Sequence, residues 1–177
     1  MTRMRTQDAT AVAVCAALWA VLNALMSPVF WQLTHMPFLC DLLAFASLVL
    51  VVWWTRKFGS ASMTGLIVAV LTFIIRPGSF YMLGFLAASI AFDLITKAIG
   101  YARLFSKSLF GSLSTIALST ISAALAGAII GSFFMSFTTP IAVATFVGLH
   151  AVGGLIGGAI GVITISALAA RQIAPYK

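Results

Sequence analysis

Long apolar runs fill most of this chain, and short polar breaks divide them into six segments. A transmembrane helix needs about 20 mostly apolar residues, and fewer where it packs inside a bundle. The runs cover about residues 7–26, 37–55, 60–75, 79–99, 108–134 and 141–170. Pro28 is expected to end the first helix, and Arg76-Pro77-Gly78 the third. The pattern predicts an all-α, polytopic membrane protein, a bundle of six transmembrane helices.

Composition agrees with this prediction. The chain is 62% hydrophobic and 7% charged, with a mean hydropathy of +1.15, whereas soluble domains carry about 25% charged residues. Little sequence remains outside the segments, so we expect one transmembrane domain over residues 1–177. The net charge of +7 is spread over short loops, where anionic lipid accounts for it and no nucleic-acid partner is needed.

The lysines and arginines predict the direction of the helices. Nine of the ten lie on one side of the six segments: Arg3, Arg5, Arg56, Lys57, Lys97, Arg103, Lys107, Arg171 and Lys177. Positive residues in short loops favour the cytoplasm. We therefore expect both termini to be cytoplasmic and Arg76, the tenth cation, to face outward.

Near the predicted cytoplasmic face, local pairing accounts for two acids. Asp93 precedes Lys97 by four residues, which predicts an ion pair along one helix. Asp8 is placed to cap the first helix. The two cysteines lie at different predicted depths, so no disulfide between them is expected.

Several polar side chains should gather in the outer leaflet. Asp41 and Arg76 lie at or near the outer ends of two segments, and His150 lies two to three turns into the sixth. Tyr81 opens the fourth segment, and a further set belongs to the first outer link or its approaches: Asn23, Trp31, Gln32 and His35. A carboxylate, a guanidinium, an imidazole and aromatic rings suit a small heteroaromatic ligand. The alternatives are that Asp41 and Arg76 pair with each other and that His150 is a satisfied core histidine.

Catalysis and metal binding find little support in the sequence. It contains no HExxH, Gly-x-Ser-x-Gly or P-loop motif. A metal site built from His35, Cys40, Asp41 and His150 would lack a recognisable ligand spacing. We therefore expect neither an enzyme nor a bound cofactor or metal.

Small residues recur every four positions in two segments. Ala9, Ala13 and Ala17 share one face of the first segment, with Ala16 and Ala20 beside them. The sixth segment carries two neighbouring glycine rows, of which one is Gly153, Gly157 and Gly161 and the other is Gly154 and Gly158. Such rows allow close helix packing in lipid. They predict packing within the bundle or, for the alanines, docking of a partner.

Taken together, six helices, cytoplasmic termini, an alanine row on the first helix and an outward polar pocket resemble the substrate-binding S components of energy-coupling factor (ECF) vitamin transporters. The resemblance implies that Ala9, Ala13 and Ala17 dock a transmembrane coupling subunit, which two cytoplasmic ATPases drive, in a prokaryotic plasma membrane. The N-terminal histidine of cobalt and nickel S components has no counterpart in Met1-Thr2-Arg3-Met4, so no metal cargo is expected.

Residues 38–94 are most similar to the branch associated with thiamine or its hydroxymethylpyrimidine precursor. The similarity rests on Thr55-Arg56-Lys57, Gly65 and the turn Arg76-Pro77-Gly78-Ser79. It implies a vitamin-like substrate bound by Asp41, Arg76 and His150, with Trp31, His35 and Tyr81 nearby. Two other functions stay open: a self-sufficient oligomeric carrier or channel packed through the sixth-segment glycines, and a membrane enzyme acting on lipid.

Overall fold

The computed structural model describes residues 4–34, 36 and 38–173, and these residues contain no β-strand. The elements run in the order α1 (Thr6–Thr34), α2 (Phe38–Thr55), α3 (Ser60–Ile75), α4 (Met82–Ile99), α5 (Tyr101–Leu104), α6 (Leu109–Ile129), the π-helix η1 (Ile130–Phe134) and α7 (Pro140–Ala170). The six long helices coincide with the six predicted segments, whereas the single-turn helix α5 was not predicted.

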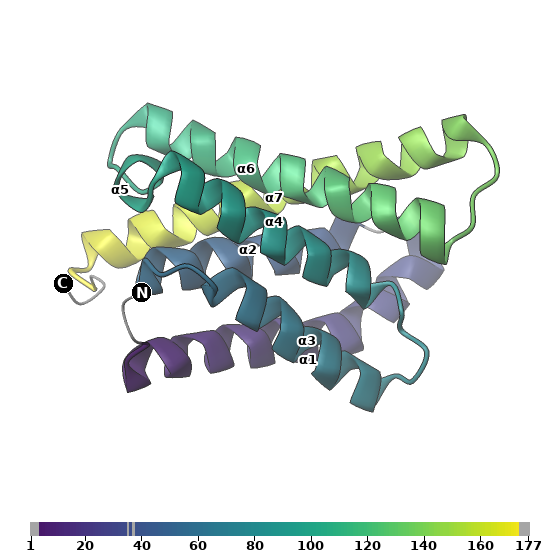
Figure 1. The fold of residues 1–177 in the computed structure, drawn as a ribbon, viewed down its shortest axis with the longest axis horizontal. Coiled ribbons are helices and arrows are strands. Elements are labelled where there is room, and N and C mark those ends of the chain that lie inside the picture. Colours follow the sequence, from purple (N-terminus) through teal and green to yellow (C-terminus); the bar gives the residue numbers. More distant parts are fainter. Residues whose placement is uncertain (1–3, 35, 37, 174–177) are drawn as a thin grey trace.

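The six long helices form a closed ring. Contacts connect α1 to α2, α2 to α7, α7 to α6, α6 to α4, α4 to α3, and α3 back to α1. The helices run roughly along the long axis of the molecule, and the start of α1 and the end of α7 lie at the same end (Figure 1). The α3–α4 turn and the α6–α7 link lie at the opposite end (Figure 1).

The outer surface of the ring is apolar. Four helices of the described chain are long and apolar enough to span a membrane: α1, α4, α6 continued by η1, and α7. The shorter α2 and α3 are equally apolar, and the 16 residues of α3 rise about 24 Å. Large side chains such as Ile74 and Leu109 are 71% and 76% exposed. These are the features of a multi-pass membrane protein.

Helix α2 lies in the core, and α7 packs closely against it. Phe45, Leu48 and Val52 of α2 are fully buried. A Cβ atom added to Gly157 of α7 would lie 2.8 Å from the backbone oxygen of Leu42. The glycine rows therefore serve packing inside the bundle: Gly157 and Gly161 face α2, while Gly154 and Gly158 face α6.

We predict that Gly157→Ala lowers the free energy of unfolding of the purified protein by about 1–3 kcal/mol. The added methyl group would meet the backbone of α2, which cannot move aside. Gly148→Ala is the matched control on the same helix, since nothing lies within 4 Å of its added Cβ. Thermal unfolding in detergent, followed by circular dichroism, measures both. Equal stability of the two variants would contradict this packing.

The prediction that Pro28 ends the first helix is wrong, because α1 continues through Pro28 to Thr34. A proline inside a helix removes one backbone hydrogen bond but does not prevent the following residues from staying helical. The additional helical residues carry Phe30, Trp31 and Gln32 over the end of the bundle where Arg76 lies. The link from α1 to α2 is correspondingly short.

The predicted Asp93–Lys97 pair is also wrong. Asp93 is fully buried, and its Oδ2 accepts hydrogen bonds of 2.7 Å from both the backbone N–H and the hydroxyl of Ser62. The carboxylate therefore caps the first turn of α3, where unpaired N–H groups and the helix dipole favour a negative charge. The Lys97 ammonium instead lies 4.8 Å from the ring centroid of Phe58.

Because Asp93 and Lys97 have different partners, replacing each with alanine should change stability by different amounts. Asp93→Ala should lower the free energy of unfolding by about 2 kcal/mol, because it leaves two partly buried donors of Ser62 without their acceptor. Lys97→Ala should cost less than about 1 kcal/mol, since it removes an exposed cation–π contact. Chemical denaturation in mixed micelles can compare the two, and an equal loss would support the local ion pair.

The described cations, apart from Arg76, lie in segments at the end where α1 starts and α7 ends. There Asp8 accepts a hydrogen bond from the Arg5 backbone N–H, which confirms its capping role, and it also lies 2.7 Å from the Lys57 ammonium. Both cysteines are free. Arg76 follows α3 at the opposite end, beside the links that enclose the candidate site.

Candidate functional site

A cavity of about 280 Å³ lies at the end of the bundle that carries Arg76. Its lining comes from α1, α2, α4, α7, the π-helix and the turn after α3: Ser27, Pro28, Phe30, Trp31, Gln32, Met36, Leu39, Cys40, Arg76, Tyr81, Phe85, Ile130, Met135, Phe146 and His150. The wall is mostly apolar with a few polar groups, as in small-molecule sites. The volume suits a small ligand.

His150 and Asp41 form the deepest polar pair of the site. His150 Nδ1 lies 2.8 Å from the Asp41 carboxylate, and the two residues are 1% and 0% exposed. The other ring nitrogen, Nε2, is buried and has no hydrogen-bond partner among the described residues. The carboxylate thus orients the imidazole, and the imidazole keeps one buried polar atom without a protein partner.

Close helix packing makes room for this pair. A Cβ atom on Gly127 of α6 would lie 2.8–2.9 Å from the His150 side chain, so glycine at that position allows the imidazole to fit between the helices. On the other side, Gly157 brings the backbone of α7 against that of α2 at Asp41 and Leu42. Small residues on α6 and α7 therefore position the histidine.

Aromatic rings surround the imidazole. Phe146 lies one turn before His150 on α7, with ring centroids 4.6 Å apart and an edge-to-face orientation. Phe85 of α4 lies 5.9 Å from the same imidazole, and Phe137 packs edge-to-face on Phe146 at 5.3 Å. Contacts between these rings therefore hold the imidazole in place within an aromatic wall.

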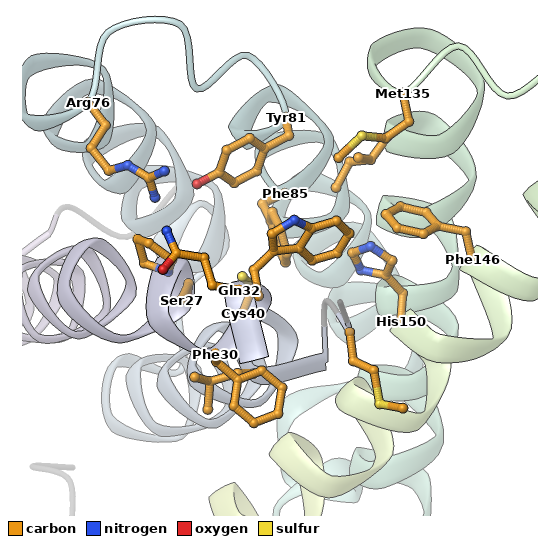
Figure 2. Close-up of a pocket in the computed structure, with 15 residues that line it drawn as sticks. Ser27, Phe30, Gln32, Cys40, Arg76, Tyr81, Phe85, Met135, Phe146 and His150 are labelled. Atoms are coloured by element: carbon orange, nitrogen blue, oxygen red, sulfur yellow. The ribbon is translucent and has the colours of Figure 1, made fainter. Parts of the chain in front are cut away.

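Arg76 and Tyr81 form the outer polar side of the cavity. In Figure 2 the side chains of Arg76, Gln32 and Tyr81 gather on one side, while His150 lies across from them beside Phe146. Two features fix the turn between α3 and α4. Gly78 has a φ of 89°, which suits glycine. The Ser79 hydroxyl donates a hydrogen bond to the Arg76 carbonyl at 2.8 Å. Partial burial raises the pKa of the Tyr81 phenol above its ordinary value.

The π-helix adds the remaining wall. Helix α6 widens into η1 over Ile130–Phe134, and the backbone N–H of Met135 donates to the Ile130 carbonyl at 2.8 Å. Ile130 and Met135 both line the cavity. Such one-turn π segments are frequent at functional sites because they redirect side chains.

The predicted site residues differ in where they lie relative to the cavity. Arg76, His150, Trp31 and Tyr81 line the cavity, whereas Asp41 lies behind His150 and pairs with it rather than with Arg76. His35 lies outside the described residues. Asn23 is buried beneath the site, where its amide oxygen accepts a hydrogen bond from Ser27 at 2.7 Å. The described residues contain no group of three metal-ligating side chains.

Sequence reasoning missed the apolar wall, including Phe30, Cys40, Phe85 and Phe146. A signal was present, since Phe85 follows Tyr81 by four residues and Phe146 precedes His150 by four. Residues four apart on a helix share a face. Applying that spacing to each predicted polar residue would have found both phenylalanines.

On α1, the structure separates the two alanine rows. Ala16 and Ala20 are fully buried against the neighbouring helices, whereas Ala9, Ala13 and Ala17 are exposed on the outer surface. The exposed alanine row is therefore not used for packing within the bundle.

Comparison of the chain with models of known protein families, with curated proteins and with solved structures finds no match.

Proposed function

We propose that this chain is the substrate-capture S subunit of an ECF-type importer. In this role it binds a small vitamin or vitamin precursor, thiamine or hydroxymethylpyrimidine, and delivers it with a coupling subunit and two ATPases. The observation that carries the proposal is the mostly apolar cavity lined by His150, whose buried Nε2 has no hydrogen-bond partner among the described residues and whose ring packs against Phe146. A buried polar atom without a partner is costly unless a ligand or water satisfies it.

The charge distribution supports an outward-facing cavity. The cations of the described chain other than Arg76 lie in the loops and helix ends away from the cavity, and such loops favour the cytoplasm. A plasma membrane protein with both termini cytoplasmic would present the cavity to the outside. Solute could then enter without crossing the bilayer.

The exposed alanine row supports a partner. Ala9, Ala13 and Ala17 offer a narrow surface without long side chains, on which another helix can approach closely in lipid. The sequence has no nucleotide-binding motif, so the energy for transport would come from the partner ATPases. The coupling subunit would dock on α1 and reorient the loaded bundle.

The two rival functions fit less well. An oligomer packed through the α7 glycines would need residues that already contact α2 and α6. An enzyme could use the Asp41–His150 pair as a general base. However, no hydroxyl or thiol of the described residues lies within hydrogen-bond distance of His150 Nε2, so that pair lacks a nucleophile of its own.

Co-expression with an ECF coupling subunit and its two ATPases tests the proposal. We expect the chain to co-purify with the coupling subunit as one copy per complex, and uptake in proteoliposomes to require ATP. Uptake by the chain alone, together with a stable homo-oligomer in detergent, would favour the carrier. Turnover of lipid that is lost in His150→Ala would favour the enzyme.

A further inference from the structure

The carboxylates of this chain are few enough to be followed individually. The sequence contains three acidic side chains. Asp8 pairs with Lys57 at the opposite end of the bundle, and Asp93 caps the first turn of α3. Asp41 lies against His150 and does not line the cavity. No carboxylate is therefore available to a ligand in the cavity.

The buried Asp41–His150 pair is expected to be neutral overall. Both side chains are almost fully buried, and a net charge there would be costly without a compensating ion. In a neutral pair, one proton lies between Nδ1 and the carboxylate and the other is on Nε2. This holds whether the shared proton belongs to the acid or to the imidazole. Nε2 consequently carries an N–H donor, and His150 is one of the residues that line the cavity.

The opposite side of the cavity is rich in donors as well. Arg76 carries five N–H donors and no acceptor, and its guanidinium has no hydrogen bond or ion pair among the described residues. Figure 2 places it beside Gln32 and Tyr81, which can donate or accept. The formal charge facing the cavity is therefore positive.

From this arrangement we propose that the cavity selects an aromatic heterocycle that presents hydrogen-bond acceptors and carries no positive charge, and that it rejects cations. This inference rests on the proposed function and narrows its substrate. Ring nitrogens or a carbonyl would accept from His150 Nε2, and the outer end of the ligand would accept from Arg76. Of the two expected vitamins, hydroxymethylpyrimidine meets these requirements, whereas the thiazolium of thiamine would face Arg76 without a counter-ion.

Two matched probe pairs test the inference on the full chain in nanodiscs. The first pair is hydroxymethylpyrimidine and thiamine, which share an aminopyrimidine ring. The second is pyridine-3-carboxamide and its N-methylpyridinium derivative, which differ by a methyl group, a positive charge and a ring acceptor. Each probe is titrated and its binding is followed by tryptophan fluorescence. Within each pair that shows binding, the uncharged member should have a dissociation constant at least about tenfold lower than that of the charged member.

Reversing the charge of Arg76 provides the second arm. Arg76→Glu supplies the missing carboxylate at a partly exposed turn, so it should lower the dissociation constant for thiamine at least about tenfold. Arg76→Gln is the matched control, since it removes the cation without adding an anion and should give a smaller change.

The outcomes separate this inference from the capture function. Tighter binding of thiamine than of hydroxymethylpyrimidine by the unmodified chain, or no gain for thiamine in Arg76→Glu, would overturn the inference and leave the capture function in place. Absence of binding by all four probes, together with failure to co-purify with a coupling subunit, would contradict both.

Discussion

Replacing His150 with alanine should raise the dissociation constant of the substrate about 100-fold. The change removes a buried N–H donor and an imidazole that packs edge-to-face on Phe146 at 4.6 Å. Loss of a buried hydrogen bond to the ligand costs about 1–3 kcal/mol, and the upper part of that range corresponds to roughly this factor. Isothermal titration of the purified variant against hydroxymethylpyrimidine measures the loss.

Asp41 variants distinguish ligand contact from general destabilisation. Asp41→Ala should also weaken binding, because the imidazole loses the group that orients it at 2.8 Å. Asp41→Asn should retain most of the affinity, since an amide N–H can donate to Nδ1 and keep the proton on Nε2. Melting temperatures without ligand serve as the folding control. Equal affinities of His150→Ala and of the unmodified protein for the substrate would contradict substrate binding at this site.

Filling the exposed alanine row should abolish transport while sparing substrate capture. Ala13→Trp places a large ring where α1 offers a flat surface, so a partner helix could no longer approach closely. We expect ATP-dependent uptake, and the yield of the complex with the coupling subunit, to fall more than about tenfold. The dissociation constant for substrate should stay unchanged, because Ala13 does not line the cavity.

Ala117→Trp is the matched control for this prediction. Ala117 is an exposed alanine on α6, so tryptophan there has the same effect on the lipid-facing surface without touching α1. Uptake should remain normal in this variant. If both variants lose uptake equally, or if neither does, the alanine row is a lipid-facing surface and the docking proposal fails.

Much of the fold followed from the hydrophobic pattern, because each apolar run forms one long helix and each polar break lies between two helices. The third segment was predicted at the residues that α3 occupies, where Gly59 and the Arg76-Pro77-Gly78 turn mark its ends. The first helix extends past its predicted end at Pro28, since a proline permits a helix to continue when the neighbouring turns are supported by packing.

The sequence predicted where the site residues lie along their helices, but it did not predict which side chains pair with each other. Arg76, Tyr81 and His150 were expected in the outer leaflet from their positions along the helices, and they share the cavity. The Asp41–His150 pair joins residues 109 positions apart, and it depends on the order of helices around the ring. Depth in the membrane follows from sequence, whereas adjacency of helices does not.

The same reason explains why Asp93 was assigned to the wrong partner. Lys97, four residues along the same helix, was the one partner visible to a local pattern, whereas Ser62 belongs to another helix. A buried carboxylate can gain more from two short hydrogen bonds at a helix start than from an exposed ammonium. The spacing of residues along one helix does not indicate hydrogen bonds to a neighbouring helix.

Ligand capture in this cavity is tested most directly by a thermal-shift screen of the purified protein. The screen includes hydroxymethylpyrimidine, thiamine, other vitamins and transition-metal ions. A ligand that binds the folded state alone adds RT ln(1 + [L]/Kd), so a nanomolar ligand at micromolar concentration should add about 4 kcal/mol of stability. We predict a large shift with an uncharged heteroaromatic vitamin precursor, which disappears in His150→Ala. No shift with any member, or an equal shift in His150→Ala, would contradict capture in this cavity.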